Sequence, residues 1–182
     1  YLTIDHNVQF ETEKALREGL ARHRAARAWA IVLAVKTGAI LAMASLPDYE
    51  PERFNRSSAD DKVNRAISES YEPGSVMKVL TACAAMNEGM LGPDSQISTA
   101  RDDPNYYRLP GDAGHRWEAT ISLRDALVHS SNIVFGKLGC DLGPRRLWEY
   151  MIAFGFGRKT GVELPGEETG IVPNWRQWDK VK

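Results

Sequence analysis

The sequence has little of three features that mark particular classes of protein. Its two cysteines, Cys83 and Cys140, are too few among 182 residues for a disulfide framework. Its formal net charge is −1, so it lacks the basic excess of a nucleic-acid surface, and no nucleic-acid partner is expected. No apolar run is long enough to span a bilayer, and no signal peptide is visible. The 43% of hydrophobic residues nevertheless suffices for a packed core.

The histidines, the acidic residues and the chain ends do not indicate a particular function. The histidines do not stand at metal-ligand spacing, so no metal site is expected. The acidic residues of a Pro-rich, charged stretch are expected to be solvated charges: Asp102, Asp103, Asp112 and Glu118. Both ends look like cuts through structured chain, so an upstream anchor and a downstream part are left open.

A helix and a strand pair are predicted at the start of the chain. Apolar residues recur at helical spacing between Asp5 and Ala26, with Asp5 or Asn7 as the cap. The apolar runs 28–35 and 39–45 flank a Lys-Thr-Gly turn, which predicts a β-hairpin. Because both runs are apolar throughout, helices are expected on both faces of this hairpin.

Helices dominate the prediction for the rest of the chain, after a surface excursion over 47–70. A helix is predicted from Ser75 to Glu88, followed by a long loop over 92–118. Ser122 opens the next helix with a capping box, and two more helices follow, over 133–140 and 143–154. The order of helix, hairpin and helix cluster predicts an α/β chain, more narrowly α+β, with a sheet packed on helices.

Ser75 and Lys78 form the first candidate for chemistry. Their spacing at the start of a helix places both side chains on one face, within reach of each other. A serine hydroxyl becomes a good nucleophile when a neighbouring group takes its proton. A lysine does this only when neutral, and burial or a nearby positive potential lowers its pKa. The Ser75 N–H at the helix N-terminus also suits a developing oxyanion.

The longer context of this pair resembles the active-serine segment of class B penicillin-binding proteins. The resemblance lies in Asn64-Arg65-Ala66 and in the run from Tyr71 to Lys78. The family's second motif, Ser-x-Asn, is matched by Ser130-Ser131-Asn132 between two predicted helices. By resemblance, Ser130 relays a proton between Lys78 and the leaving group, and Asn132 binds Lys78 and the substrate amide.

The resemblance covers nearly the whole chain and implies its organisation. Residues 1–182 are interpreted as one partial transpeptidase domain with a β-lactamase/transpeptidase-like fold, in which an antiparallel sheet packs against helices beside an all-helical subregion. The C-terminal part of that fold is expected to lie outside the chain. The expected parts are an opening helix and hairpin (1–46), an active-serine helix (75–89), a Ser-x-Asn helical region (120–154) and a Gly/Pro-rich tail (155–182).

The family's third motif, Lys-Thr-Gly, occurs twice, and neither copy is expected to be catalytic. Lys36-Thr37-Gly38 is a hairpin turn upstream of Ser75, which is the wrong order. Lys159-Thr160-Gly161 lies among glycines and a proline, whereas the motif must sit on a strand that edges the cleft. The resemblance places the true motif further along, so residues 1–182 alone are expected to be inactive.

The implied activity is that of a serine-type D,D-transpeptidase of peptidoglycan synthesis, acylated at Ser75 by D-Ala-D-Ala stem peptides and by β-lactams. No cofactor is implied. Such enzymes are anchored in the bacterial cytoplasmic membrane, face outward and work with cell-wall synthesis partners. The sequence from Tyr71 to Ser75 favours the cell-division subgroup over the elongation subgroup, which maintains cell shape.

Two other functions remain as alternatives to the transpeptidase. A serine β-lactamase needs a residue that activates water, and no Glu in a helical setting after Asn132 resembles the one in class A enzymes. A β-lactam sensor or a non-catalytic penicillin-binding domain would be acylated without turnover, or would not react. Turnover of a peptide substrate separates the transpeptidase from both.

Overall fold

The computed structural model describes residues 2–106, 108–112, 114–115 and 117–178. The chain divides into two compact units, and each is described by itself. The first unit consists of Tyr1–Ser70 with Gly161–Glu168, and the second of Tyr71–Thr160 with Thr169–Lys182. Helices and antiparallel strands together make the chain an α+β protein, as the sequence predicts. The assignment of all 182 residues to one partial domain stays a prediction.

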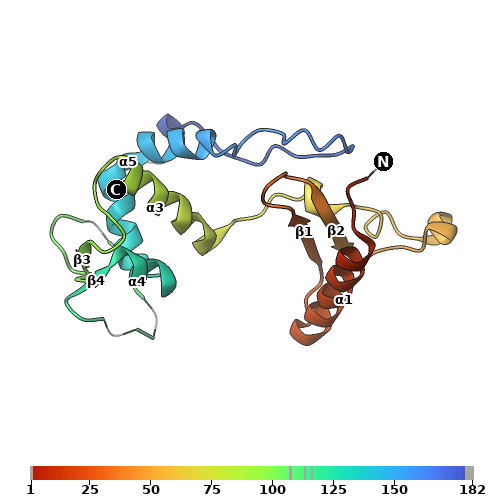
Figure 1. Ribbon diagram of the computed structural model, residues 1–182, viewed down its shortest axis with the longest axis horizontal. Helices are drawn as coiled ribbons and strands as arrows, with labels where there is room; N and C mark the ends of the chain where they lie inside the picture. Colours follow the sequence, from red (N-terminus) through yellow and green to blue (C-terminus); the bar gives the residue numbers. More distant parts are fainter. Residues whose placement is uncertain (1, 107, 113, 116, 179–182) are drawn as a thin grey trace. The chain divides into compact units, whose positions relative to one another are not determined.

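The first unit is built on helix α1 (His6–His23) and the hairpin of β1 (Ala28–Leu33) and β2 (Ile40–Leu46). Asp5 caps α1, because its carboxylate accepts the N–H groups of Asn7 and Val8. The two strands pair antiparallel, as predicted, and α1 packs along the hairpin in Figure 1.

The outer edge of β2 is covered by Asp5 and by the first turn of α1. The Gln9 amide donates to the Met43 carbonyl (3.0 Å) and accepts the Met43 N–H (2.8 Å). The Asp5 N–H donates to the Leu41 carbonyl at 2.9 Å. These bonds satisfy backbone groups that an open strand edge leaves unpaired, so β2 does not present a free edge here.

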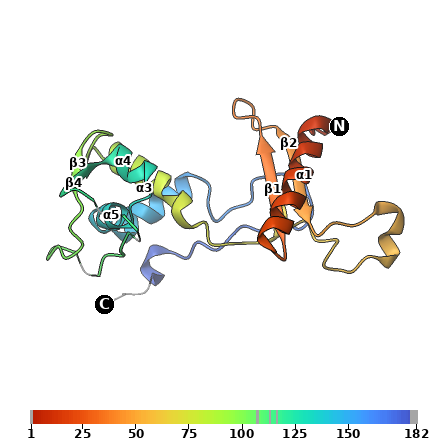
Figure 2. The ribbon, with the colours of Figure 1, turned by 90° about the horizontal axis from the view of Figure 1, so that it is seen from below.

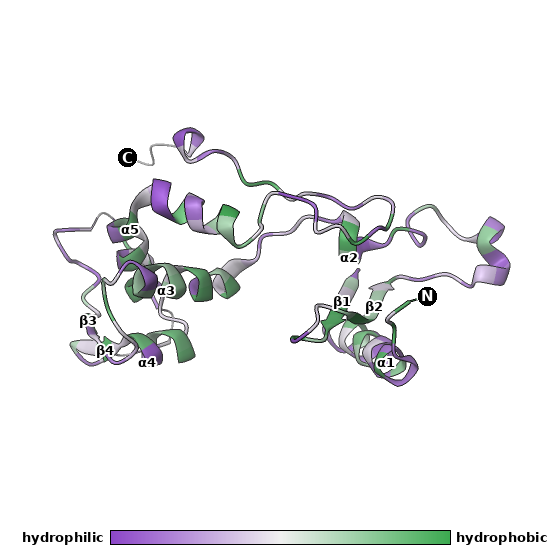
Figure 3. Ribbon diagram, turned by 45° about the horizontal axis from the view of Figure 1, so that its top comes forward, coloured by the Kyte–Doolittle hydropathy of each residue, from purple (hydrophilic) through white to green (hydrophobic). Residues whose placement is uncertain are grey.

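Helices lie on both faces of the hairpin, but they cover the two faces unequally. The single-turn helix α2 (Arg65–Ser68) contacts both strands, and Figure 3 shows it on the side of the hairpin opposite α1. On β2, the side chains of Ala42, Ala44 and Leu46 are buried. On β1, Ile31 and Leu33 stay 41% and 53% exposed, so the predicted cover is incomplete.

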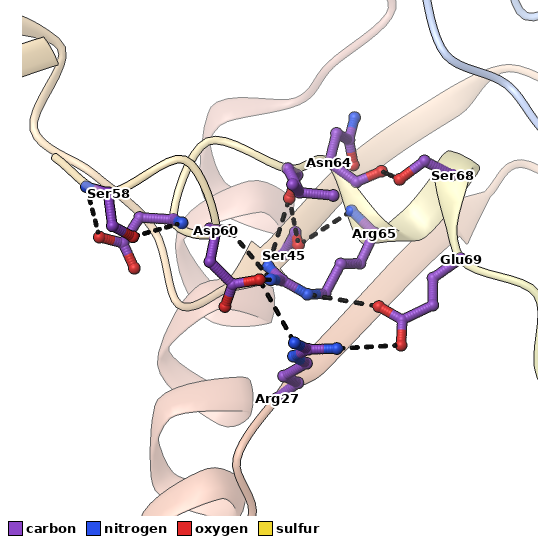
Figure 4. A network of polar contacts seen from close by, with 10 residues as sticks. Arg27, Ser45, Ser58, Asp60, Asn64, Arg65, Ser68 and Glu69 are labelled. Carbon is purple, nitrogen blue, oxygen red and sulfur yellow. Dashed lines mark hydrogen bonds and ion pairs between the residues drawn. The ribbon is translucent and has the colours of Figure 1, made fainter.

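A buried arginine holds α2 in place (Figure 4). Arg65 is 1% exposed, and its guanidinium lies 2.6 Å from an Asp60 carboxylate oxygen and 3.3 Å from a Glu69 oxygen. The partly exposed Arg27 pairs with both of these carboxylates as well. The Ser45 hydroxyl accepts the Arg65 N–H at 3.2 Å. The start of β1, strand β2, the end of the surface excursion and α2 are therefore joined by one set of polar contacts.

The surface excursion predicted over 47–70 extends only over 47–64, because Arg65 at the start of α2 is buried. Ion pairs hold this excursion at its beginning as well as at its end. Asp48 pairs with Arg17 of α1 at 2.8 Å. Between this pair and Asp60 lies the exposed 3-10 helix η1 (Pro51–Arg56). The Phe54 ring packs against Tyr49 at 5.6 Å between ring centroids, so the excursion has its own small packing centre.

The second unit is a helical cluster of α3 (Lys78–Asn87), α4 (Leu123–Val128) and α5 (Asn132–Ala153), gathered in one group in Figure 2. The 3-10 turn η2 (Gly74–Met77) precedes α3, so the predicted helix is present with a tighter first turn. The buried core is contributed by all three helices: Ala82, Ala84, Ala85, Leu123, Ala126, Val134, Phe135, Leu138 and Leu142.

The predicted capping and break signals act as expected in α4 and α5. Ser122 accepts the Asp125 N–H at 3.0 Å and donates to its carboxylate at 2.6 Å, which forms the start of α4. Gly143 has a non-helical backbone (φ 71°, ψ 163°) and divides α5 into the two helical segments that the sequence predicts. Pro144 follows this break, where a missing N–H costs little.

The sequence prediction missed one feature of the second unit. The strands β3 (Gln96–Ser98) and β4 (Thr120–Ser122) pair antiparallel at the two ends of the loop over 99–119. These strands are too short to show an alternating pattern. A last 3-10 turn, η3 (Trp175–Gln177), lies in the tail. Within the described residues, no helix combines the length and apolar character needed to cross a membrane.

Candidate active site

Lys78 is the centre of a polar cluster at the beginning of α3. Its amine donates to the Ser130 carbonyl at 2.6 Å, to the Ser130 hydroxyl at 2.9 Å and to the Asn132 side-chain oxygen at 2.6 Å. The structure thus brings together three of the four residues singled out in the sequence, across more than fifty positions of chain. Every acceptor comes from the Ser-Ser-Asn segment.

The setting of Lys78 shifts its pKa downward. Burial lowers the pKa of the amine, because the charged form loses solvation, and the field of Asp112 opposes this by raising it. The first effect is larger, so the net pKa lies below the ordinary value for lysine. A lowered lysine pKa is what a general base near neutral pH requires.

Ser75 lies in η2, three residues before Lys78, and its side chain is exposed. Within the described part of the chain, its hydroxyl makes no hydrogen bond, including none to the Lys78 amine. Unliganded sites often hold catalytic groups at longer distances than the reacting complex does. An exposed hydroxyl without a hydrogen bond is open to an incoming carbonyl carbon.

The break between α4 and α5 shapes the Ser-Ser-Asn segment. Ser130 adopts a left-handed backbone (φ 57°), which only a few per cent of non-glycine residues do. In this conformation both its carbonyl and its hydroxyl accept from the same lysine. Ser131, 1% exposed, caps α5 by accepting the Val134 N–H at 3.2 Å. Asn132 is the first residue of α5, so its backbone is fixed by the helix.

Asp112 was missed in the sequence as a member of this cluster. Its carboxylate accepts hydrogen bonds from the Ser131 hydroxyl (2.6 Å), the Trp117 indole N–H (2.8 Å) and the Asn132 N–H. The expectation of a solvated charge is therefore wrong for Asp112, although it holds for the exposed Asp102 and Glu118. No local pattern marks Asp112, because its partners on α5 lie 19 and 20 positions away.

Two contacts fasten the loop over 99–119 to α5. Leu109 is 3% exposed and lies so close to Gly136 that a Cβ there would come within 3.1 Å of its side chain. Lys137, 3% exposed, pairs with Asp103 at 2.8 Å. The hydrogen bond from Lys137 lowers the pKa of Asp103, so this carboxylate is not the solvated charge that was expected. Asp103 and Leu109 of this loop are thus packed against α5.

Among the described residues, neither Lys-Thr-Gly triplet supplies a hydrogen-bond partner to Lys78. Lys36-Thr37-Gly38 forms the hairpin turn, in which the Gly38 N–H donates to the Ala34 carbonyl at 2.8 Å. Lys159 is exposed, and no strand is found over 155–170. That neither triplet edges a substrate cleft stays a prediction.

Comparison with known proteins agrees with the family resemblance seen in the sequence. The family model described as the penicillin binding protein transpeptidase domain matches residues 28–182. A probable peptidoglycan D,D-transpeptidase, PbpC of Pseudomonas aeruginosa, is 32% identical over 99% of this chain and 32% of its own length. Penicillin-binding protein PbpB of Mycobacterium tuberculosis is 32% identical over 97% of this chain and 26% of its own.

A solved structure shares the fold. The crystal structure of a peptidoglycan glycosyltransferase from Burkholderia ambifaria superposes with a TM-score of 0.81 at 25% identity. The match covers 98% of this chain and 52% of the other. The chain therefore spans between a quarter and a third of the length of the curated relatives named above and about half of this solved chain.

Proposed function

The chain belongs to the penicillin-binding protein transpeptidase family, and we propose that the full-length protein is a peptidoglycan D,D-transpeptidase with Ser75 as nucleophile. The observation that carries the proposal is the hydrogen-bonded cluster of Lys78, Ser130 and Asn132 beside an exposed serine. A half-buried lysine with a lowered pKa, three residues from a serine hydroxyl, supports acyl transfer through that hydroxyl.

The first half of the reaction forms an ester on Ser75. Neutral Lys78 takes the hydroxyl proton while the Ser75 oxygen bonds to the carbonyl carbon between two D-alanines. The Ser75 N–H, in the turn before α3, stabilises the resulting oxyanion. The C–N bond then breaks, and the proton passes from Lys78 through the Ser130 hydroxyl to the departing D-alanine amine. Asn132 holds the Lys78 amine and the substrate amide.

The second half returns the enzyme to its starting state. The amine of a neighbouring stem peptide bonds to the ester carbonyl carbon and gives up a proton along the same Ser130–Lys78 route. The C–O bond to Ser75 breaks, and the proton returns to its oxygen. The products are the cross-linked peptide and free enzyme, so neither an oxidant nor a cofactor is required.

Peptide turnover tests the proposed function. The full-length protein is incubated with a stem peptide that ends in D-Ala-D-Ala and with an amine acceptor. We expect release of one D-alanine for each peptide transferred to the acceptor. Stable acylation by a β-lactam without D-alanine release would instead indicate a sensor or a non-catalytic binding domain. Rapid hydrolysis of the β-lactam would indicate a serine β-lactamase.

The cellular setting is also proposed. The full-length protein is held at the bacterial cytoplasmic membrane with this domain on the outer face, where stem peptides are available. Its ligands are peptidoglycan stem peptides and β-lactams, and it acts with other cell-wall synthesis proteins. The sequence from Tyr71 to Ser75 supports placement in the division subgroup.

Substitution of Lys159 tests whether the third motif lies at residues 159–161. We expect Lys159→Ala in the full-length protein to leave β-lactam acylation nearly unchanged, because this lysine is exposed in an irregular segment. A lysine that biases proton transfer in the cleft would cost about a hundred-fold or more on removal. Acylation rates from a labelled penicillin time course measure the difference. A large loss in a folded Lys159→Ala protein would mean that the third motif lies at residue 159.

A further inference from the structure

The loop between β3 and β4 delivers one carboxylate to the beginning of α5. Asp112 accepts hydrogen bonds from Ser131, Trp117 and the Asn132 N–H, and the Ile133 N–H reaches it as well. The first backbone N–H groups of a helix have no partner within the helix, and the helix dipole favours a negative charge there. Asp112 therefore occupies a position that is both hydrogen-bonded and electrostatically favourable.

We propose that Asp112 is a positioning residue for acyl transfer, which holds the Ser-Ser-Asn segment in the orientation that binds Lys78. The proposal rests on the proposed function and adds to it a residue outside the family motifs quoted above. Asp112 touches neither Lys78 nor Ser75 through a hydrogen bond. It acts through Asn132 and Ser131.

The contacts around Asn132 show how this positioning works. The Asn132 side-chain oxygen accepts from Lys78 at 2.6 Å, and its amide nitrogen donates to the Gly111 carbonyl at 3.1 Å. Its backbone N–H is bound by Asp112. The Gly111 carbonyl opposes a flip of the side-chain amide, because a flip would break its bond to the amide nitrogen, while Asp112 holds the backbone of the same residue. The oxygen is thus directed at the lysine.

Asp112 is itself held firmly. The loop that carries it is fastened by the close contact of Leu109 with Gly136 and by the buried Lys137–Asp103 pair. The Trp117 indole that donates to Asp112 stacks on His115, at 4.9 Å between ring centroids. These contacts place the carboxylate without help from the groups that it orients.

The charge of Asp112 has a second consequence at the site. Burial alone would raise the pKa of this carboxyl, but the donors from Ser131, Asn132, Trp117 and Ile133 outweigh it and hold the pKa below the usual range. The carboxylate is therefore anionic at neutral pH, and its field reaches Lys78.

The effect of the Asp112 charge on the pKa of Lys78 can be tested, because the groups around the Lys78 amine are known. Among the described residues, the groups that face its amine are the neutral Ser130 and Asn132, the Phe135 ring at 6.0 Å and, through its field, Asp112. The field raises the pKa of Lys78 against the larger lowering by burial. Removing the negative charge should therefore lower that pKa further.

Asp112→Asn separates positioning from general stability. The second-order rate of acylation by a labelled penicillin is measured from acid to alkaline pH in the full-length protein. We expect a loss of about 10- to 100-fold at the plateau, because reacting groups lose their alignment. We also expect the rise in rate with pH to begin at lower pH, since Lys78 becomes neutral there. Trp117→Phe, which removes one donor to Asp112, should show a smaller plateau loss.

The matched control is Asp102→Asn, which removes the same charge from an exposed position in the same loop. We expect this variant to keep the wild-type rate and pH profile. Wild-type behaviour of Asp112→Asn would overturn the proposal. So would a plateau loss with an unmoved pH profile and a lowered melting temperature, which a purely structural role predicts. If Asp112→Asn does not fold, a Trp117→Phe protein with the wild-type rate overturns it.

Failure of the positioning role can be distinguished from failure of the proposed function. Mass spectrometry of the wild-type adduct is the first step. If the wild-type protein is not acylated on Ser75, the proposed function fails, and the role of Asp112 falls with it. If the wild type is acylated on Ser75 and the Asp112 and Trp117 variants match it, only the positioning role is overturned.

Discussion

Replacing Ser75 with alanine should abolish covalent labelling of the full-length protein by a fluorescent penicillin. Ser75 is exposed at the turn before α3, and we propose its oxygen as the atom to which the acyl group bonds. Loss of the nucleophile removes the ester, so no adduct should form even after long incubation. The wild-type adduct, mapped by mass spectrometry of its peptides, should lie on Ser75.

The fold should tolerate this change, which makes the result easy to interpret. The Ser75 side chain makes no hydrogen bond with another described residue, so its removal should alter the free energy of unfolding by less than about 0.5 kcal/mol. Ser70→Ala is the matched control, because Ser70 is also exposed and lies close in sequence. Labelling on Ser130 with Ser75 unmodified would show that the nucleophile has been assigned wrongly.

Replacing Lys78 with alanine should slow acylation by about a hundred-fold or more, since a general base is lost. The alanine also leaves the Asn132 oxygen and the Ser130 carbonyl without their donor, so some loss of stability is expected, about 1–3 kcal/mol. The rate is therefore compared at a temperature where melting curves show the variant fully folded.

Lys78→Arg distinguishes a base from a mere positive charge. Arginine keeps the charge and the donors but stays protonated at all working pH values, so it cannot accept the Ser75 proton. We expect it to be as slow as Lys78→Ala, whereas Lys36→Ala in the hairpin turn should react at the wild-type rate. In the wild type the rate should rise with pH through the lowered pKa of Lys78. Near-normal acylation of either Lys78 variant would assign the base elsewhere.

The sequence could indicate that Lys78, Ser130 and Asn132 come together because the motifs that contain them are local. Ser75 and Lys78 are three positions apart in a helical context, and Ser130 and Asn132 lie in a break that caps and apolar spacing both mark. The caps at Asp5 and Ser122 were visible for the same reason. Such signals depend on neighbours within one helical turn.

Contacts between distant loops could not be predicted in this way. Asp112 and Asp103 stand in a stretch that is rich in proline and charge, where solvated side chains are the usual outcome. Their partners Asn132 and Lys137 are 20 and 34 positions away, and only the folded loop brings them together. Gly136 carried no signal either, because a glycine within a helix does not indicate which side chain will lie against it.

The tethers at both ends of the surface excursion imply a place where the protein can be extended. Asp48 is paired with Arg17 before the excursion, and Asp60 with the buried Arg65 after it. The residues between these pairs can therefore change in number while the hairpin and α2 keep their anchors. Each doubling of loop length costs only about 0.6 kcal/mol of closure entropy. The exposed η1 turn is thus a suitable point for inserting an affinity tag or a fluorophore-binding peptide.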